Sequence, residues 1–269
     1  MFVTDAGTAE AASNILHVNG AGGATTSAPG NSNQIVITTA ATPFTPNATL
    51  NEFDDFISPT GQGGKLQWAN IQGCSVFSIN GTAVNPGISS YLSNGPGNAS
   101  GIALDKKSSS GPNTIGDFVL GGGAFSMNWV VQLSALSAGG NTYRFSCGLA
   151  DATSLNTPTD SFVSGVYFQY TNTVNGGNWT INCTNASTTT TVNTATAAGT
   201  SFVNLGISVN AAGTSVGFTI NGVTVGTAII TNIPTACITP FFMAINTAGT
   251  NPQLNADLWY MTLTLTTPR

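Results

Sequence analysis

The hydrophobic pattern is clearest over residues 202–229, FVNLGISVNAAGTSVGFTINGVTVGTAI, where apolar and polar residues alternate in successive runs. A period of two places one apolar row on one face of a β-sheet, and Val223 and Val225 extend that row. Asn221 and Gly222 separate two runs and predict a type I′ hairpin turn, because both central residues of that turn adopt positive φ. These residues therefore predict an antiparallel meander whose apolar face a second sheet must cover.

Similar strand patterns recur from residue 52 to the end of the chain, about every ten residues. The strand over residues 125–133 has the inward row Phe125, Met127, Trp129, Val131 and Leu133. No stretch keeps the period of a helix, so we predict none. The fold class predicted is all-β, an antiparallel two-sheet jelly roll. Further strands are predicted over residues 66–68, 75–79, 88–92, 101–104, 116–120, 143–149, 165–170, 179–183, 187–194, 241–246 and 256–266.

The beginning of the chain differs from the rest. Residues 1–45 hold two short predicted strands, 14–18 and 34–38, joined by a segment rich in Gly, Ser, Asn and Thr. Two such strands bury little surface alone, so we expect a small β-rich spacer, anchoring or oligomerisation module that assembles as a homotrimer. Pro43 and Pro46 favour extended backbone, and residues 46–51 are predicted to be a linker. The jelly roll then covers residues 52–269.

Charge is scarce along the whole chain. Charged residues make up 6% of the sequence, the net charge is −5, and five residues are basic. Nucleic-acid binding needs clustered Lys and Arg, so we expect no nucleic-acid partner. No apolar run approaches the roughly 20 residues of a membrane span, and the N-terminus shows no secretory signal. Such a polar, charge-poor surface suits proteins that assemble or act outside a cell.

The metal-binding and nucleophilic residue types are sparse. The four cysteines are widely spaced and the sequence has one histidine, His17, which argues against a zinc site. We predict that Cys147 and Cys183 are buried free thiols, and a disulfide formed under oxidising conditions remains the alternative. His17 lies outside the jelly roll, so a Ser–His–Asp triad within it is excluded. No cofactor is expected.

An enzyme would need paired carboxylates, as glycoside hydrolases do. The sequence has two glutamates, Glu10 and Glu52, and one acidic cluster, residues 51–55. Glu52 and Asp54 alternate onto one side, so a bound cation is one hypothesis and a solvated strand start is the other. Polar turn and cap roles are sufficient for Asp151 and Asp160, which lie in a loop, and for Asp257. We therefore expect no catalytic residues, no metal ligands and no enzymatic activity.

Aromatic side chains with nearby amides are the candidate binding residues, because their ring faces can contact sugars. The first region comprises Tyr170, Asn178 and Trp179, at the two ends of the loop over residues 171–178. Trp179 shares a row with apolar residues, so core packing is the alternative there. Tyr91, in GISSYLSNG, is the second candidate.

Several segments, taken in order, resemble proteins of phage tail fibres and spikes that contain a concanavalin A/laminin-G-like jelly roll. The segments are FDDF (53–56), GGKLQW (63–68), FVLGGGAFSMNWVVQLSALS (118–137), GVYFQYTNTVNGGNWTINCTN (165–185), VNAAGTSVGFTINGVTVGT (209–227) and LTLTTPR (263–269). Residues 4–38 also resemble a spacer that recurs in phage fibres.

This resemblance implies a virion surface or tail appendage protein with a lectin-like jelly roll that contributes to host-surface recognition. The implied partners are the chain itself as a homotrimer, other virion proteins and a host surface glycan. The implied location is the virion, assembled in the host cytoplasm and active outside the cell. Two alternatives remain: a purely structural decoration or fibre protein that binds only virion subunits, and a polysaccharide-degrading enzyme that would use Asp54, Asp55 and Asp257.

Overall fold

The computed structural model describes residues within the compact unit Ala48–Thr267. The described ranges are 48–56, 66, 68–71, 74–79, 89–93, 97, 99–104, 118–140, 142–156, 162–249 and 253–267. The predicted module over residues 1–45 and the first two residues of the predicted linker lie outside these ranges, and so does His17.

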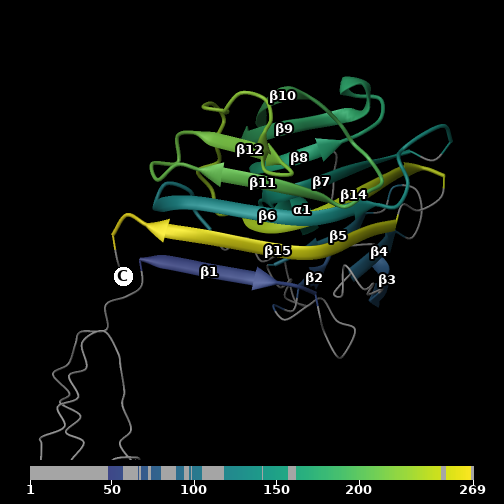
Figure 1. Cartoon of the computed structure of the whole chain (residues 1–269), viewed down its shortest axis with the longest axis horizontal. Helices are drawn as coiled ribbons and strands as arrows, with labels where there is room; N and C mark the ends of the chain where they lie inside the picture. The colour runs from purple at the N-terminus through teal and green to yellow at the C-terminus, as the bar shows by residue number, and fades with distance from the viewer. Residues whose placement is uncertain are drawn as a thin grey trace, which may run out of the picture. The chain divides into compact units, whose positions relative to one another are not determined.

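The described strands form two antiparallel sheets (Figure 1). The eight-stranded sheet has the order β13 (Val223–Thr224), β12 (Val216–Ile220), β11 (Val203–Val209), β6 (Gly123–Leu133), β15 (Gln253–Leu265), β4 (Ser89–Ser93) and β3 (Cys74–Ile79), and β1 (Thr49–Asp54) also pairs with β15. The seven-stranded sheet has the order β10 (Thr188–Ala197), β9 (Asn178–Asn185), β8 (Gly165–Tyr170), β7 (Thr142–Ala150), β14 (Thr239–Ala248), β5 (Ala99–Ala103) and β2 (Ala69–Asn70). This arrangement confirms the predicted all-β, two-sheet architecture.

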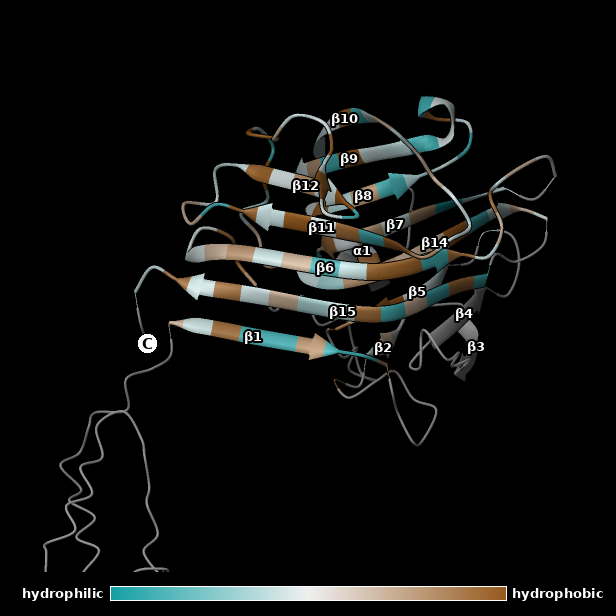
Figure 2. Cartoon of the chain, viewed as in Figure 1, coloured by the Kyte–Doolittle hydropathy of each residue, from teal (hydrophilic) through white to brown (hydrophobic). Residues whose placement is uncertain are grey.

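The main core lies between the sheets. Along β6, every inward residue of the predicted row is at most 3% exposed. The matching rows of β11 and β15 pair with β6 in register, so apolar side chains of neighbouring strands gather on one face. Figure 2 shows the same alternation of hydrophobic and hydrophilic residues along β6, β11 and β15. The period of the sequence therefore identified the buried face correctly.

The predicted Asn–Gly turn is also confirmed. Asn221 has φ 50° and Gly222 has φ 77°, which are the positive values that a type I′ turn requires. The outcome differs one residue later, because Val223 is 67% exposed whereas Val225 is buried. β13 is a two-residue edge strand, and nothing described packs over the side chain of Val223.

Four predictions about secondary structure need correction. Residues 49–51 belong to β1, because β15 offers them a full ladder of partners. Residues 66–68 are not a strand where described, since Leu66 lies in a turn, and Phe118 of the predicted strand 116–120 forms an isolated bridge with Ile238. A short helix, α1 (Ala152–Asn156), was not predicted, and the second helical element is the 3-10 turn η2 (Asn175–Gly177). No described helix has the length and apolarity to cross a membrane.

The thiols of Cys147 and Cys183 are free and buried, as predicted. Burial raises the pKa of the Cys147 thiol, and it raises that of Cys183 to about 12. The folded state therefore keeps its thiol protons at pH values where the unfolded chain, with a thiol pKa of about 8.5, releases them. The contribution of these thiols to the free energy of unfolding is fully present below the pKa of the unfolded chain, and it decreases as the pH rises above that pKa.

We expect the free energy of unfolding to fall by up to about 1.4 kcal/mol per pH unit for each of these two thiols between roughly pH 8.5 and 10. Urea unfolding of the full-length protein at a series of pH values measures this slope. The double variant Cys147→Ala, Cys183→Ala should lose most of it. An equal slope in the variant and the natural protein would contradict the assignment.

Candidate functional site

The side of the seven-stranded sheet that faces away from the main core carries polar residues on four adjacent strands, β7 to β10. These residues alternate with Phe145, Phe168 and Ile181, which are fully buried in the core, so they point to the opposite side. Strand register aligns Ser146, Gln169, Thr180 and Asn193 in one row and Asn182 with Thr191 in the next, while Arg144 and Asn178 lie two residues before Ser146 and Thr180 on their strands. We call this group the polar strip, and its members are Arg144, Ser146, Gln169, Asn178, Thr180, Asn182, Thr191 and Asn193.

Hydrogen bonds connect five members of the polar strip. Gln169 Nε2 donates to Ser146 Oγ (3.3 Å), and Thr180 Oγ1 donates to the carbonyl oxygen of Gln169 (3.3 Å). Asn182 Nδ2 donates to Thr180 Oγ1 (3.4 Å), while Asn182 Oδ1 accepts from Thr191 Oγ1 (2.7 Å). The network therefore fixes the direction of amide and hydroxyl groups across all four strands.

Exposure varies in a regular way across the strip. Ser146, Thr180 and Asn182 are each 3% exposed, so they form its buried base. The members that a ligand can reach are the half-buried or exposed ones, and the buried members hold two of them, Gln169 and Thr191, by hydrogen bonds. These accessible members are Arg144, Gln169, Asn178, Thr191 and Asn193.

An apolar cluster bounds the strip on the same side of the sheet. The ring of Phe162 lies 4.7 Å from that of Tyr167 and 4.9 Å from that of Phe241. Gly148 stands between these two residues in the strand register and has no side chain to separate them. A Cβ atom at Gly148 would lie 2.2 Å from the carbonyl oxygen of Val166. The absence of a side chain at this position thus allows Phe162 to cover the β8–β7–β14 part of the face.

Asp151 forms hydrogen bonds with α1 and with Ser164, two residues after Phe162. Its Oδ1 accepts from the backbone N–H of Ser154 (2.8 Å), which is the N-terminal cap that starts α1. Its Oδ2 accepts from Ser154 Oγ (2.7 Å) and from the N–H of Ser164 (2.9 Å). The structural role predicted for Asp151 is confirmed, and the unpredicted helix follows from this cap.

The electrostatics of the strip depend on a single residue. Among all residues of the seven strands of this sheet, Arg144 alone is charged. Its side chain is half-buried, and this loss of solvation lowers its pKa, while the interaction with Tyr167 opposes the shift. Burial also raises the pKa of Tyr167, which stays a neutral phenol whose hydroxyl lies 3.4 Å from Thr184 Oγ1. On the strands of this sheet, the guanidinium group of Arg144 is therefore the one formal charge.

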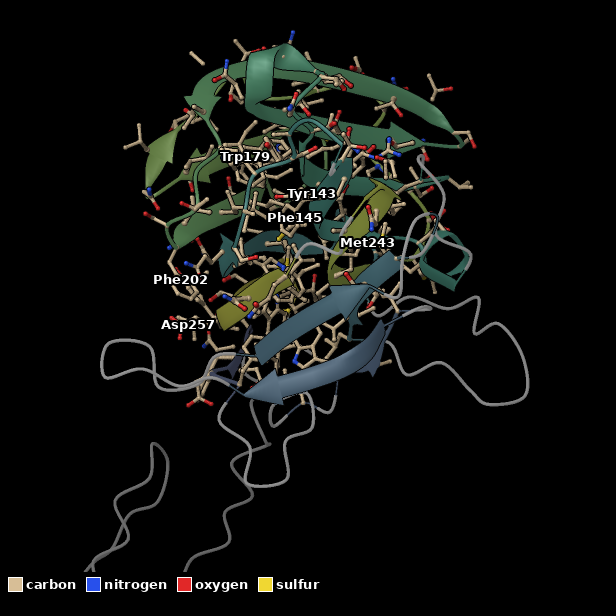
Figure 3. The ribbon with its side chains drawn as sticks, turned by 90° about the vertical axis from the view of Figure 1, so that its right-hand side faces the viewer. Tyr143, Phe145, Trp179, Phe202, Met243 and Asp257 are labelled. Carbon is tan, nitrogen blue, oxygen red and sulfur yellow. The ribbon has the colours of Figure 1, made fainter. Side chains whose placement is uncertain are left out.

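Of the four predicted binding residues, one lies in the polar strip. Asn178 begins β9 in phase with Thr180 and is half-buried. Tyr170 and Trp179 belong to the main core, with 2% and 1% exposure, and their ring centroids are 5.9 Å apart. Figure 3 shows Trp179 beside Phe145 in the interior. The faces of both rings contact other core side chains, so they are not available to stack on a sugar ring.

The fourth predicted residue, Tyr91, lies in β4, and its side chain is outside the described structure. The loop predicted to form the site together with Tyr170 and Trp179 is anchored by Asn175. Asn175 Nδ2 donates to the carbonyl oxygens of Trp179 (3.0 Å) and Thr194 (2.8 Å). This loop therefore stays close to the first residues of β9, next to Asn178.

Asp54, in the acidic cluster, has a structural role that differs from both hypotheses. Asp54 is fully buried. Its Oδ1 accepts from the backbone N–H of Phe56 (2.9 Å), and its Oδ2 accepts from the N–H of Leu66 (2.8 Å) and from Nε1 of Trp68 (3.1 Å). Both oxygens face N–H donors, so Asp54 is neither a solvated residue nor a metal ligand.

The remaining carboxylates lie elsewhere. Glu52 is half-buried on β1, and Asp257 lies at a register shift inside β15 rather than at its start. Within the described residues, no group of three or more His, Cys, Asp or Glu side chains is placed to hold a metal ion. The strands of the polar strip contain no carboxylate.

Sequence analysis missed most of the polar strip. The signal was present in the polar halves of GVYFQY, NWTINCTN and TTTTVN, because each strand alternates a core residue with a neutral hydrogen-bonding residue. Each strand alone suggests only a solvated face. These polar residues form one surface because the strand registers place them next to one another.

No protein-family model and no curated protein matches this sequence. Solved structures do match its fold. A protein of unknown function from Shewanella oneidensis is 11% identical with a TM-score of 0.56, over 82% of this chain and 89% of that one. Peanut lectin is 11% identical (TM-score 0.46; 81% and 99% covered), and a carbohydrate esterase of the Shiga toxin-encoding bacteriophage phi24B is 14% identical (0.47; 74% and 92%). At such identities the likeness concerns the fold alone, which is an antiparallel two-sheet jelly roll.

Proposed function

We propose that this jelly roll binds glycans through the polar strip, as the host-recognition part of a virion surface or tail appendage. The observation that carries the proposal is the hydrogen-bonded network in which the buried residues Ser146 and Asn182 orient the accessible residues Gln169 and Thr191. Amides and hydroxyls both donate and accept hydrogen bonds, as the hydroxyl groups of sugars do. Groups that are already oriented lose little freedom when a ligand binds.

The virion role in this proposal rests on the sequence resemblance to phage fibre and spike proteins. The low charge of the chain is consistent with close packing among other virion proteins. We further propose that residues 1–45 join three copies of the chain. A fragment that lacks them should be a soluble monomer by light scattering, and a trimeric fragment would contradict this assignment.

The proposal is one of binding without catalysis. Asp54, the first residue of the hydrolase hypothesis, has both carboxylate oxygens bonded to N–H groups in the core. Asp257 belongs to the other sheet from the polar strip. A pair of carboxylates flanking a glycosidic bond would need both groups at the sugar, and the strands of the strip supply none.

A bulky substitution at the strip tests the proposal. Thr191 and Thr224 are both exposed strand residues, but Thr191 lies in the polar strip and Thr224 lies on the edge of the other sheet. We expect Thr191→Trp to weaken binding of the full-length protein to a glycan array and to whole candidate host cells by about tenfold or more, because the indole obstructs a polar contact surface. Thr224→Trp should bind as the natural protein does.

Two outcomes would overturn this proposal. One is equal binding by the two variants, which would place the ligand elsewhere. The other is a natural protein that binds no glycan and no cell. Saturable cell binding that free glycan competes away would support it.

A second candidate function is purely structural, and one observation favours it. Phe53 and Tyr260 are cross-strand partners on the outer face of the eight-stranded sheet, where they are 56% and 37% exposed. Exposed aromatic pairs are typical of protein interfaces. A protein that ignores cells and glycans but loses incorporation into particles on the double change Phe53→Ser, Tyr260→Ser would favour this function.

A further inference from the structure

Arg144 has an unusual position for a charged residue. It is the only charged residue on the seven strands of its sheet, and in the part of the chain that the structure describes it is the only basic one. It lies on β7 two residues before Ser146, so both side chains are on the same face as the polar strip. Across the sheet, Ser146 stands opposite Gln169. The guanidinium group thus belongs to the same surface as the amides and hydroxyls of the strip.

The surroundings of Arg144 are not those of a solvated surface charge. Its side chain is half-buried, and the residue opposite it on β14 is the buried Ile245. Loss of solvation lowers the pKa of Arg144, which means that the charged form is held there at a cost. A neutral sugar would be recognised by amides and hydroxyls alone. A positive charge beside these amides and hydroxyls would also bind a negatively charged group of a ligand.

The guanidinium group suits one kind of anion in particular. Its planar arrangement of N–H donors matches a carboxylate with two parallel hydrogen bonds, which are shorter and stronger than those between neutral groups. The protein as a whole carries a net charge of −5, so an anionic polymer is not attracted by the overall field. Attraction must come from a local cation. The polar strip contains one, and its strands contain no carboxylate that would repel the ligand.

We propose that the polar strip selects acidic glycans, and that Arg144 binds the carboxylate of a uronic or sialic acid unit while Gln169 and the neighbouring amides and hydroxyls bind its hydroxyl groups. This inference rests on the proposed glycan-binding function and makes it specific. Arg144 is then the specificity-determining residue. The neutral members of the strip contribute affinity for any sugar ring that fits.

The test uses the full-length protein and three probes: polygalacturonate, alginate and polysialic acid, each compared with its carboxyl-reduced form. Carboxyl reduction removes the charge and leaves the sugar backbone in place. We expect the natural protein to bind at least one acidic polymer about tenfold or more tightly than the reduced form. That preference should weaken as salt is added, because salt screens the charge interaction.

Variants of Arg144 separate recognition from folding. Arg144→Gln should abolish the preference for the acidic polymer, and Arg144→Lys should restore part of it, because Lys keeps the charge but not the paired hydrogen bonds. Thermal unfolding of each variant shows whether Arg144 serves only the packing beside Ile245. If Arg144→Gln does not fold, the comparison of acidic and reduced polymers with the natural protein still decides the question.

The possible results distinguish this inference from the proposed function. Equal binding of acidic and reduced polymers, or binding to neutral glycans alone, would overturn the role of Arg144 and leave glycan binding intact. Unchanged preference in a folded Arg144→Gln protein would do the same. A protein that binds none of these polymers and nothing on a glycan array would overturn both.

Discussion

Replacing Asp54 by Asn is expected to lower the free energy of unfolding by about 3–5 kcal/mol, which makes it one of the two most damaging substitutions that the structure identifies. The carboxylate accepts hydrogen bonds from the backbone N–H groups of Phe56 and Leu66 and from Nε1 of Trp68. An asparagine amide would keep one acceptor and turn its NH₂ group toward at least one donor. Buried donors without an acceptor cost free energy because they lost their water on folding.

The effect should spread through the aromatic core. Trp68 is held by Asp54, and its ring centroid lies 5.1 Å from that of Trp129 and 5.0 Å from that of Trp259. Phe56 also contacts Trp68, at 6.0 Å, and it adopts a positive φ of 53°, a strained value for a bulky residue. Asp54 therefore stabilises both the turn after β1 and one side of the core.

Thermal and urea unfolding of the full-length protein measure this prediction. The control is Glu52→Gln, which changes a half-buried carboxylate two residues earlier on the same strand and should alter stability by less than about 1 kcal/mol. If Asp54→Asn unfolds at the same denaturant concentration as the control, the buried carboxylate is not stabilising the fold in this way.

Replacing Gly148 by Ala is expected to be at least as damaging, with a loss of about 3 kcal/mol or more. The backbone at Gly148 has φ 155°, and the new Cβ would lie 2.2 Å from the oxygen of Val166 and 2.7 Å from the Cα of Tyr167. Both are backbone atoms of the paired strand β8, so no side-chain rotation relieves the clash. The strands must separate locally.

The same substitution should affect function through Phe162. The new Cβ atom would also lie 3.0 Å from the Cβ of Tyr167, whose ring packs against Phe162. We expect a Gly148→Ala protein that still folds to bind glycans less well, since the apolar cluster adjoins the polar strip. Gly140→Ala is the matched control, because a Cβ there meets nothing within 4 Å. Equal unfolding transitions for the two variants would refute the steric argument.

Two sheets enclose one core, and the side of the seven-stranded sheet away from that core is divided between an apolar cluster and the polar strip. In the apolar cluster Phe162 packs against Tyr167 and Phe241, beside the strands that bear the strip. A rigid sheet is a better support for oriented hydrogen-bonding groups than a loop is.

The sequence predicted whatever depends on local geometry. Alternation along residues 125–133 identified the buried row of β6, because strand side chains alternate with a period of two. Asn221 and Gly222 predicted their own turn, since few residues tolerate positive φ. The buried thiols of Cys147 and Cys183 were predicted from their places in apolar rows. Each of these predictions needed only the residue and its near neighbours.

Features that depend on residues far apart in the sequence could be seen only in the tertiary structure. β1 exists because β15, some 200 residues later in the chain, pairs with it, and Asp54 is buried because Trp68 and Leu66 fold back over it. Tyr170 and Trp179 became core residues when the second sheet closed over them, although their sequence resembles a binding loop. The polar strip required the registers of four strands. Strand pairing depends on contacts between residues far apart in the sequence, and a local pattern of apolar and polar residues does not indicate which strands will pair.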